Sequence, residues 1–567
     1  MTKQDEGPGA KAPMAPPSTA GGTFVPTMVA PPRRTTLLIL GGLLTGLLLS
    51  AMDQTIVATA GPTIISDLGG LSLYAWVFSA YILTQTVSLP IFGKLSDLYG
   101  RKKFYVLGLA VFMGGSILSG AAQNIDELII FRAIQGIGSG AFFPIALAIV
   151  GVSFPPSMRG RTQGIFASVF GIAAVVGPSV GSYIVEAINW RWIFYINLPL
   201  GIASFILIWF GVKESRNANA KPSIDILGVS TLTAWVVLLI LGFLDGGTTY
   251  PWYSWQEYIT FAGAAVLFVV FIVVERRAPE PVIPLDLFRN RTILSSSAVA
   301  FLRGIAFFAV ISYIPLFVQA GLGGSVSDGR NALYGFLLPL IVSAILGGQL
   351  AVRVGYRGII FGGVAVMTVG IFLLTGISQT STILDIVWRS AVMGLGVGFT
   401  FASIVIAVQY SVTRDKIGVA SSLAQFMGNL GSSIGLAVIG AVQANTFGSQ
   451  LRSLLQSLPA QAQAQAAPFL SNANLVGQVL STPATLAQMT SANPALGAPA
   501  FIQALRVAFA NSVTPLFWIS LAVSIMALVA SIFITGSMKQ QLAAGTAMAN
   551  AQKGPKDDPQ PPSPAMA

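Results

Sequence analysis

Residues 36–60, TLLILGGLLTGLLLSAMDQTIVATA, contain a single charged residue, Asp53. A helix needs about 20 apolar residues to cross the roughly 30 Å hydrocarbon core of a bilayer. The apolar run is continuous and does not alternate with polar residues, as a barrel strand would. The stretch therefore predicts a transmembrane helix with one acidic group inside it.

The rest of the chain repeats this pattern. Of its 567 residues, 54% are hydrophobic and 9% are charged, and the mean hydropathy is +0.75. A soluble domain has about 25% charged residues. The sequence therefore predicts an all-α transmembrane protein whose function concerns solutes that cross or enter the bilayer. The expected spans are 36–60, 75–92, 104–122, 128–151, 163–186, 193–212, 225–244, 258–275, 293–318, 332–352, 358–378, 385–409, 418–443 and 512–536.

The positions of the basic residues predict the orientation of the spans. An even number of spans places both termini on one side of the membrane. Most of the 31 Lys and Arg residues fall on that side, which makes it the cytoplasmic side of a plasma (inner) membrane. The net charge of +11 is thus explained by topology, and no basic soluble domain is present to bind nucleic acid. The expected outer segments hold only Arg191, Arg330, Arg452 and Arg506.

Two residue types are missing from the chain. It has no Cys, which excludes disulfides and thiolate ligands, and no His, which removes the commonest proton shuttle and metal ligand. No phosphate-binding G-x-x-x-x-G-K-[ST] loop occurs. We therefore expect no metal, no cofactor and no enzymatic activity.

A weak repeat divides the spans into groups of six, two and six. Gly93-Lys94-Leu95 with Gly100 follows the second span, and Gly348-Gln349-Leu350 with Gly355 follows the tenth. Two six-helix halves suggest bundles that rock around a midplane site. The expected organisation is a disordered cytoplasmic tail (1–35), a first bundle (36–212), two linker helices (213–292), a second bundle (293–536) and a second disordered cytoplasmic tail (537–567). The second bundle contains a long outer loop (444–511). Within this loop, 450–458 and 475–489 are candidate short helices.

Asp53 is the strongest candidate for proton coupling. It lies roughly 10 Å from the outer end of its span, by helix rise, and an intramembrane carboxylate is functional by default. Arg132 lies at a similar depth in the fourth span and is a candidate partner. A static salt bridge between helices is the alternative interpretation for both residues.

Arg303 lies near the expected centre of the ninth span. A buried arginine needs a partner or a cavity. Three interpretations stay open: it holds Asp53 in one state, it attracts an anionic group of a substrate, or it is a structural arginine satisfied by carbonyl groups.

Two glycine-containing motifs complete the candidates. The turn from Gly93 to Lys103 contains Asp97, Gly100 and Arg101, and Asp97 is expected to cap a helix or to bond Arg101. In the fifth span, small residues permit close helix packing and a proline can kink the helix. These residues are Gly171, Gly177, Pro178 and Gly181.

Aromatic and amide residues along the spans are candidates to line a substrate cavity, with helix packing as the alternative. They are Trp76, Tyr81, Gln85, Gln135, Phe166, Phe170, Phe307, Phe308, Tyr313, Gln319 and Phe399.

Together these motifs resemble the major facilitator superfamily, and within it the fourteen-span drug:proton antiporter family. The resemblance extends from about residue 36 to residue 536. It rests on the gating-loop signature at 93–103, the first-helix motif at 51–60 with Pro62, the fourth-helix motif at 132–136, the fifth-helix antiporter motif at 171–181, and the start of the sixth span at 190–199.

The resemblance implies two six-helix bundles and proton-coupled export of an amphipathic, apolar compound by alternating access. It implies roles for Asp53 and Arg132 in coupling and for Asp97 and Arg101 in gating. We expect a monomer in the lipid bilayer whose partners are the solute and protons. Two alternatives stay open: a dedicated exporter of an endogenous lipid, siderophore or antibiotic, and a transport-inactive receptor or lipid-binding scaffold.

Overall fold

The protein is a bundle of long helices. The structure is a computed structural model that describes residues 31–68, 74–154, 156–214, 225–246, 250–413, 416–457 and 499–535. Within these residues, 14 helical segments are long and apolar enough to cross a membrane. The predicted all-α transmembrane fold with fourteen spans is therefore confirmed.

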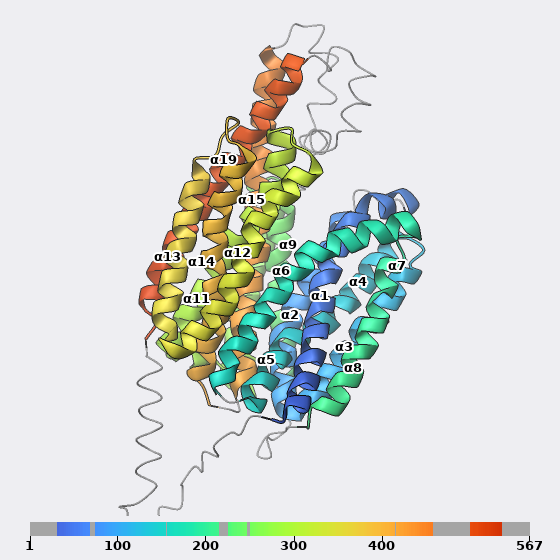
Figure 1. The fold of residues 1–567 in the computed structure, drawn as a ribbon, viewed down its shortest axis with the longest axis vertical. Coiled ribbons are helices and arrows are strands. Elements are labelled where there is room, and N and C mark those ends of the chain that lie inside the picture. The colour runs from blue at the N-terminus through green and yellow to red at the C-terminus, as the bar shows by residue number, and fades with distance from the viewer. Residues whose placement is uncertain are drawn as a thin grey trace, which may run out of the picture.

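One group of helices comes from the N-terminal part of the chain (Figure 1). Its helices pack around two clusters of buried apolar side chains. Their bounds are α1 (Arg33–Leu68), α2 (Tyr74–Tyr99), α3 (Arg101–Ala121), α4 (Ile125–Ser139), α5 (Phe142–Ser153), α6 (Pro156–Ala187), α7 (Trp192–Tyr195) and α8 (Asn197–Gly211).

A second group surrounds a separate apolar core in the C-terminal part (Figure 1). The short helix η2 (Leu285–Arg289) precedes it. Its members are α11 (Arg291–Leu316), the π-helix η3 (Phe317–Gly321), α12 (Val326–Arg353), α13 (Tyr356–Thr375), α14 (Ile383–Tyr410), α15 (Ile417–Ser457) and α19 (Pro499–Ile532).

The remaining two spans, α9 (Ile226–Asp245) and α10 (Trp255–Arg277), lie at the seam between the groups. An apolar cluster joins them to α2 and α15, and Leu232, Val236 and Phe271 are buried in it. The cluster also includes Ile293 of α11, so α9 and α10 share an apolar core with helices of both halves. The exact limits assigned above to bundles and linker stay a prediction.

The repeat seen in the sequence has a counterpart in the backbone. Gly100 precedes α3 with φ 119° and ψ 132°, and Gly355 precedes α13 with φ 111° and ψ 139°. Such positive φ values strain residues that carry a Cβ, which explains why both turns use glycine. The same sharp turn therefore connects the second and third spans of each half.

The fourth span departs from the single helix expected from its sequence. It divides into α4 and α5 at Gly140 and Ala141. A Cβ on Gly138 would lie 2.3 Å from the backbone nitrogen of Phe112, so the glycines before the break let α3 approach closely. Arg132 and Gln135, the polar residues in the middle of α4, are buried.

The expected outer loop is partly helical. Helix α15 continues to Ser457 and α19 already begins at Pro499, so both ends of the 444–511 segment belong to helices that project beyond the rest of the molecule (Figure 1). Leu451, Leu505 and Phe509 are buried between them, and Phe447 packs on Phe509 with ring centroids 5.1 Å apart. Residues 450–457, a candidate short helix, are thus the end of α15. The second candidate, 475–489, and the tails at 1–30 and 536–567 lie outside the described residues.

The face of the molecule at which α1 begins, at Arg33, and the described chain ends, at Thr535, is called the terminal face, and the opposite one the far face. The two halves approach one another most closely toward the terminal face. There Gln163 of α6 donates a hydrogen bond to Gln409 of α14 (2.7 Å). A Cβ on Gly93 of α2 would lie 2.4 Å from Ser422 Oγ of α15. In the described part of the chain, the halves are therefore in contact at the terminal face.

Candidate functional site

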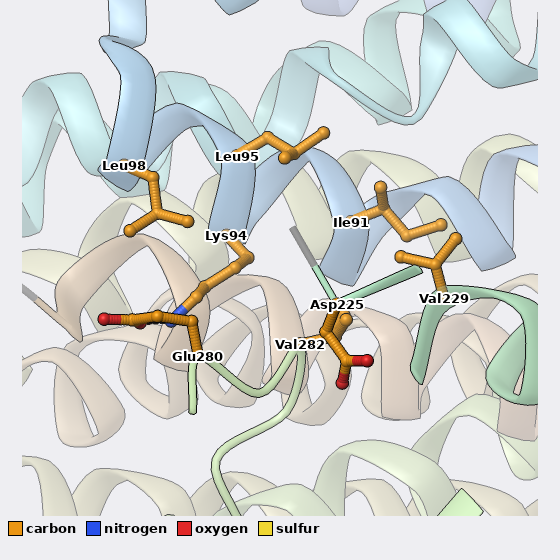
Figure 2. Close-up of a pocket in the computed structure, with 8 residues that line it drawn as sticks. All are labelled: Ile91, Lys94, Leu95, Leu98, Asp225, Val229, Glu280 and Val282. Carbon is orange, nitrogen blue, oxygen red and sulfur yellow. Dashed lines mark hydrogen bonds and ion pairs between the residues drawn. The ribbon is translucent and has the colours of Figure 1, made fainter. Parts of the chain in front are cut away.

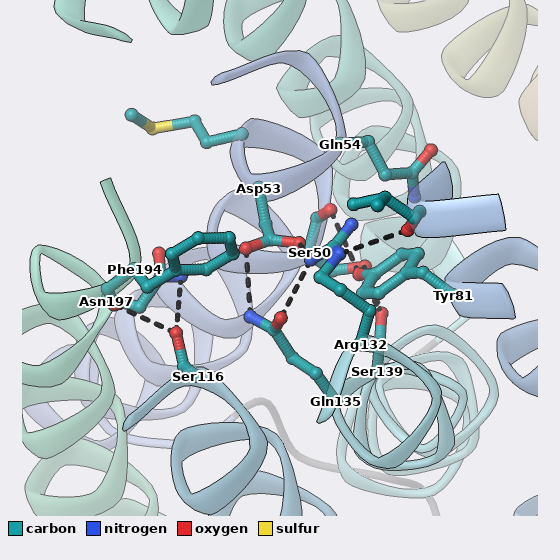
Figure 3. A network of polar contacts seen from close by, with 12 residues as sticks. Ser50, Asp53, Gln54, Tyr81, Ser116, Arg132, Gln135, Ser139, Phe194 and Asn197 are labelled. Carbon is teal, nitrogen blue, oxygen red and sulfur yellow. Dashed lines mark hydrogen bonds and ion pairs between the residues drawn. The ribbon is translucent and has the colours of Figure 1, made fainter. Parts of the chain in front are cut away.

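Asp53 is the centre of a buried polar network inside the N-terminal group (Figure 3). Its side chain is 1% exposed. One carboxylate oxygen forms an ion pair with Nη1 of Arg132. The other accepts hydrogen bonds from Nε2 of Gln135 (2.8 Å) and Nδ2 of Asn197 (3.1 Å). Three donors from α4 and α8 thus satisfy a carboxylate on α1, as a buried charge requires.

Arg132 is equally buried and has several partners besides Asp53. Its Nη1 donates to Oε1 of Gln135 (2.7 Å), and its Nε donates to the carbonyl of Val77 (3.4 Å). Its guanidinium lies over the ring of Tyr81, with Cζ 4.2 Å from the centroid. The two residues that the sequence placed at similar depth therefore meet, and they meet through a well-ordered set of contacts.

Asn197 was missed as a partner of Asp53. Nδ2 of Asn197 also donates to Oγ of Ser116 (3.0 Å), whose hydroxyl in turn donates to the carbonyl of Phe194 (2.8 Å). The signal was present in the sequence, because Asn197 is a polar amide inside the apolar sixth span and belongs to the motif at 190–199. Which other helix that amide would face required the fold.

A second polar group connects this network with a cavity. Tyr81 donates to Oγ of Ser139 (2.7 Å), and Nε2 of Gln85 donates to the hydroxyls of Ser139 (2.8 Å) and Ser50 (3.1 Å). Gln54 donates to Oε1 of Gln85 (3.3 Å). All the side chains of this second group line a cavity between the two halves, as does Arg132. They are Ser50, Gln54, Tyr81, Gln85 and Ser139. Asp53 itself is not among the residues that line the cavity, whereas its partner Arg132 is.

The cavity lies between the two halves and has a volume of about 330 Å³. Helices α1, α2, α4, α5 and α6 line one side, and α11, α12, α14 and α15 line the other. Its walls are mostly apolar and aromatic, with a few amides and hydroxyls, as in pockets that bind small organic molecules. The aromatic members are Phe78, Tyr81, Phe142, Phe143, Phe307 and Phe401.

Some of the residues expected to line a substrate cavity do so. Gln85, Arg303, Phe307 and Tyr81 line it. Gln135 instead binds Asp53 and Arg132. The side chains of Phe308 and Phe170 lie outside the described residues. The remaining candidates are not among the lining residues, because their helix faces point elsewhere. They are Trp76, Phe166, Tyr313, Gln319 and Phe399.

Arg303 does not hold Asp53 in this structure, because Arg132 does. Its Nη1 makes a long hydrogen bond to Oγ1 of Thr400 (3.5 Å), and its Cζ lies 4.3 Å from the ring centroid of Phe401. No carboxylate among the described residues forms an ion pair with it. Arg303 is therefore a buried cation at the wall of the central cavity.

Residues of the turn at 93–103 join the two halves at the terminal face. Oδ1 of Asp97 accepts hydrogen bonds from Nη2 (2.6 Å) and Nε (3.1 Å) of Arg101. Its Oδ2 accepts from the backbone nitrogen of Val419 in the first turn of α15 (3.1 Å). Asp97 thus makes both of the contacts expected from the sequence. It bonds Arg101, and it accepts a hydrogen bond from an otherwise unpaired N–H at a helix N-terminus. That helix belongs to the opposite half.

The linker segment contacts the same turn. Nζ of Lys94 forms an ion pair with Oε2 of Glu280, 2.6 Å away. Figure 2 shows these two side chains pointing toward one another. The hollow beside this pair, lined also by Asp225 and Val229, measures about 10 Å³. That is room for about one water. This hollow is therefore part of the packing between the linker segment and the 93–103 turn, and it is too small for a solute.

The fifth-helix motif brings α6 against both halves. A Cβ on Gly177 would lie 2.0 Å from Oγ1 of Thr55 on α1, and one on Gly171 would lie 2.4 Å from Ile341 on α12. Pro178 lies within α6, and Gly181 is buried. The glycines thus allow a single helix to pack closely on Asp53's own helix and on the other half.

Comparisons with known proteins identify the family. The family model described as "Major Facilitator Superfamily" matches residues 43–436. The chain is 38% identical over 503 residues to "Multidrug transporter protein MdtP" of Bacillus subtilis (strain 168), which covers 88% of this chain and 90% of that protein. It is 35% identical over 509 residues to "Multidrug resistance protein 3" of the same organism, which covers 90% of this chain and 97% of that protein.

Solved structures show the same fold at low sequence identity. The human organic anion transporter MFSD10 (TETRAN) superimposes with a TM-score of 0.52 at 13% identity, covering 87% of this chain and 100% of that one. The proton:xylose symporter XylE superimposes with a TM-score of 0.52 at 12% identity, covering 80% and 95%. With a family match across most of its spans and a shared fold, the chain belongs to the major facilitator superfamily.

Proposed function

We propose that the protein is a proton-driven exporter of amphipathic, apolar compounds that works by alternating access in the plasma membrane, with both termini in the cytoplasm. The observation that carries the proposal is the buried Asp53–Arg132 pair beside a cavity between two halves. The relatives named multidrug transporters support the choice of substrates. With the terminal face cytoplasmic, the contact between the halves there is a closed inner gate.

Protonation of Asp53 supplies the coupling step. In the structure the carboxylate is held by Arg132, Gln135 and Asn197. A proton on it removes the charge that holds Arg132, whose guanidinium then favours a different arrangement on the cavity wall. A ligand shifts a conformational equilibrium only by its differential affinity for the two states. Proton and solute thus favour opposite arrangements of the same helices.

Transport by the purified chain in proteoliposomes tests the proposal. We expect a fluorescent amphipathic compound to be moved against its concentration gradient when a proton gradient is imposed, and the movement to stop when an ionophore collapses that gradient. A receptor or lipid-binding scaffold of the same fold would bind the compound without moving it. Binding with no gradient-dependent movement would thus refute the proposal.

The inner gate makes a further prediction about Asp97. In the Asp97→Ala variant, the N-terminus of α15 loses its acceptor on α2, and Arg101 loses its partner. A lost hydrogen bond to a charged group costs about 1–3 kcal/mol, and 1.4 kcal/mol changes a population ratio about tenfold. We expect the terminal face to open more often, so that a thiol introduced at the buried Ser422 reacts with a maleimide several-fold faster.

The Ser422→Cys reporter is clean because the chain has no cysteine of its own. Asp286→Ala is the matched control, since Asp286 is exposed and pairs with Lys416 near the same face. Exposed ion pairs contribute little, so this variant should label as the parent does. Equal labelling of Asp97→Ala and Asp286→Ala would show that Asp97 does not hold the gate.

A further inference from the structure

We infer that the central cavity selects amphipathic anions and that Arg303 binds the anionic group. This inference rests on the proposed function, because it names the class of solute that the exporter takes. Three observations support the inference: the charge balance of the cavity, the surroundings of Arg303, and the hydrogen-bond donors on the neighbouring turn of α15.

The cavity has an excess of positive charge. Two arginines line it, Arg132 and Arg303. Arg132 is neutralised by its ion pair with Asp53. No Asp or Glu is among the described residues that line the cavity, so the charge of Arg303 has no counterpart there. A cationic solute would meet repulsion in this cavity, and an anionic one would meet an unneutralised partner.

The surroundings of Arg303 favour a ligand over a structural role. A guanidinium has five N–H donors, and among the described residues the side chain of Arg303 makes one hydrogen bond to the protein, the 3.5 Å contact with Thr400. Phe401 covers one face of the group and leaves its edge for in-plane hydrogen bonds. Arg303 is 7% exposed, so its charge is largely removed from water. A carboxylate or similar anion at this edge supplies the missing acceptors in the bidentate geometry that arginine prefers.

Neutral donors lie beside Arg303 on α15. A Cβ on Gly428 would lie 3.7 Å from Nη2 of Arg303, so this turn approaches the guanidinium closely. Asn429 follows it and lines the cavity. Nε2 of Gln425 donates to Oδ1 of Asn429 (3.1 Å), which leaves the NH₂ group of Asn429 as a donor toward the cavity. The apolar walls on the opposite half then accommodate the hydrophobic part of the solute.

Three probes that share one aromatic body test the inference: pyrenebutyrate, pyrenebutyramide and a pyrenebutyl trimethylammonium. Their affinities for the full chain are measured by fluorescence in nanodiscs of phosphatidylcholine, with empty nanodiscs subtracted. We expect the wild type to bind the carboxylate about tenfold or more tighter than the amide, and the ammonium most weakly. In Arg303→Gln the carboxylate should lose about tenfold or more in affinity while the amide changes little.

Two further variants separate charge from structure. Arg303→Lys keeps the positive charge without the planar fork and should retain part of the preference for the carboxylate. Arg389→Gln removes an intramembrane arginine of the same half that donates to the carbonyl of Leu373 and does not line the cavity, so its preference should equal that of the wild type.

The anionic group could come from a soluble solute or from a lipid headgroup. Adding phosphatidylglycerol to the nanodiscs distinguishes the two sources. If a headgroup occupies the site, this lipid weakens pyrenebutyrate binding to the wild type and leaves Arg303→Gln unaffected. If a free solute is the ligand, the affinity of the wild type stays unchanged. Either result retains an anion site at Arg303.

The inference is overturned if the wild type binds the carboxylate no tighter than the amide or the ammonium, or if Arg303→Gln leaves their ratio unchanged. Its failure can be told from failure of the proposed function. Gradient-driven export of pyrenebutyramide tests the exporter without using the anion site. Export of the amide with no carboxylate preference refutes the anion site alone, whereas no gradient-driven movement of any probe refutes the exporter.

Discussion

Replacing Asp53 with asparagine is expected to abolish proton-driven efflux. The variant retains a side chain of the same shape, but it cannot take up and release a proton. The chain has no His, so no imidazole can carry the proton in place of Asp53. The carboxylate of Asp53 is buried in the centre of the N-terminal network. We expect gradient-driven transport in proteoliposomes to fall to the level of empty vesicles, while binding of the fluorescent solute is retained.

Asp67→Asn is the matched control for this experiment. Asp67 lies on the same helix, α1, and its carboxylate pairs with Arg191 and accepts from Trp190 near the far face. Hydrogen bonds from Arg191 and Trp190 lower the pKa of that carboxyl, so the control removes a charged carboxylate from α1 at neutral pH. Its removal should leave transport close to wild type. Wild-type pumping by Asp53→Asn, with a proton gradient present, would contradict the coupling role.

Neutralising Asp53 and Arg132 together is expected to destabilise the protein less than neutralising either one. Each single change leaves the other charge buried and unpaired, which costs about 3–5 kcal/mol. The double variant, Asp53→Asn with Arg132→Gln, removes both charges and keeps amide groups that can bond to Gln135 and Asn197. Thermal or denaturant unfolding of the purified variants in detergent measures the three changes in stability.

A second double variant serves as the control cycle. Asp53→Asn combined with Arg303→Gln should be additive within about 0.5 kcal/mol, as expected for sites that share no partner. Arg303 bonds to Thr400 and lies over the ring of Phe401, whereas among the described residues Asp53 is bonded by Arg132, Gln135 and Asn197. If the changes in stability of the Asp53 and Arg132 single variants add up to that of their double variant, the two charges are solvated independently of one another. Coupling between Asp53 and Arg303 would show that the protein visits an arrangement in which the two meet.

The amino-acid sequence determines the membrane architecture because the bilayer reduces the choice of structure. Backbone groups in lipid must be hydrogen-bonded within a helix or a closed barrel, so continuous apolar runs such as 36–60 become helices whatever they pack against. The turn at Gly100 and its repeat at Gly355 were also readable, since only glycine tolerates that backbone. Asp53 and Arg132 were found for the same reason, because a charge in an apolar run is costly wherever the helix lies.

The three-dimensional packing of the helices decided everything that depends on which faces meet. A transmembrane helix is apolar nearly all round, so its sequence does not reveal which side contacts a neighbour. For this reason Gln135 is a cavity candidate by its sequence and instead binds Asp53. The sequence likewise does not reveal that Asn197 donates to the same carboxylate. It leaves three interpretations open for Arg303. The division of the fourth span at Gly140 and the reach of Asp97 to α15 likewise depend on close approach between helices far apart in the chain. The sequence thus determines where polar groups lie along each helix, and the packing determines which of them touch.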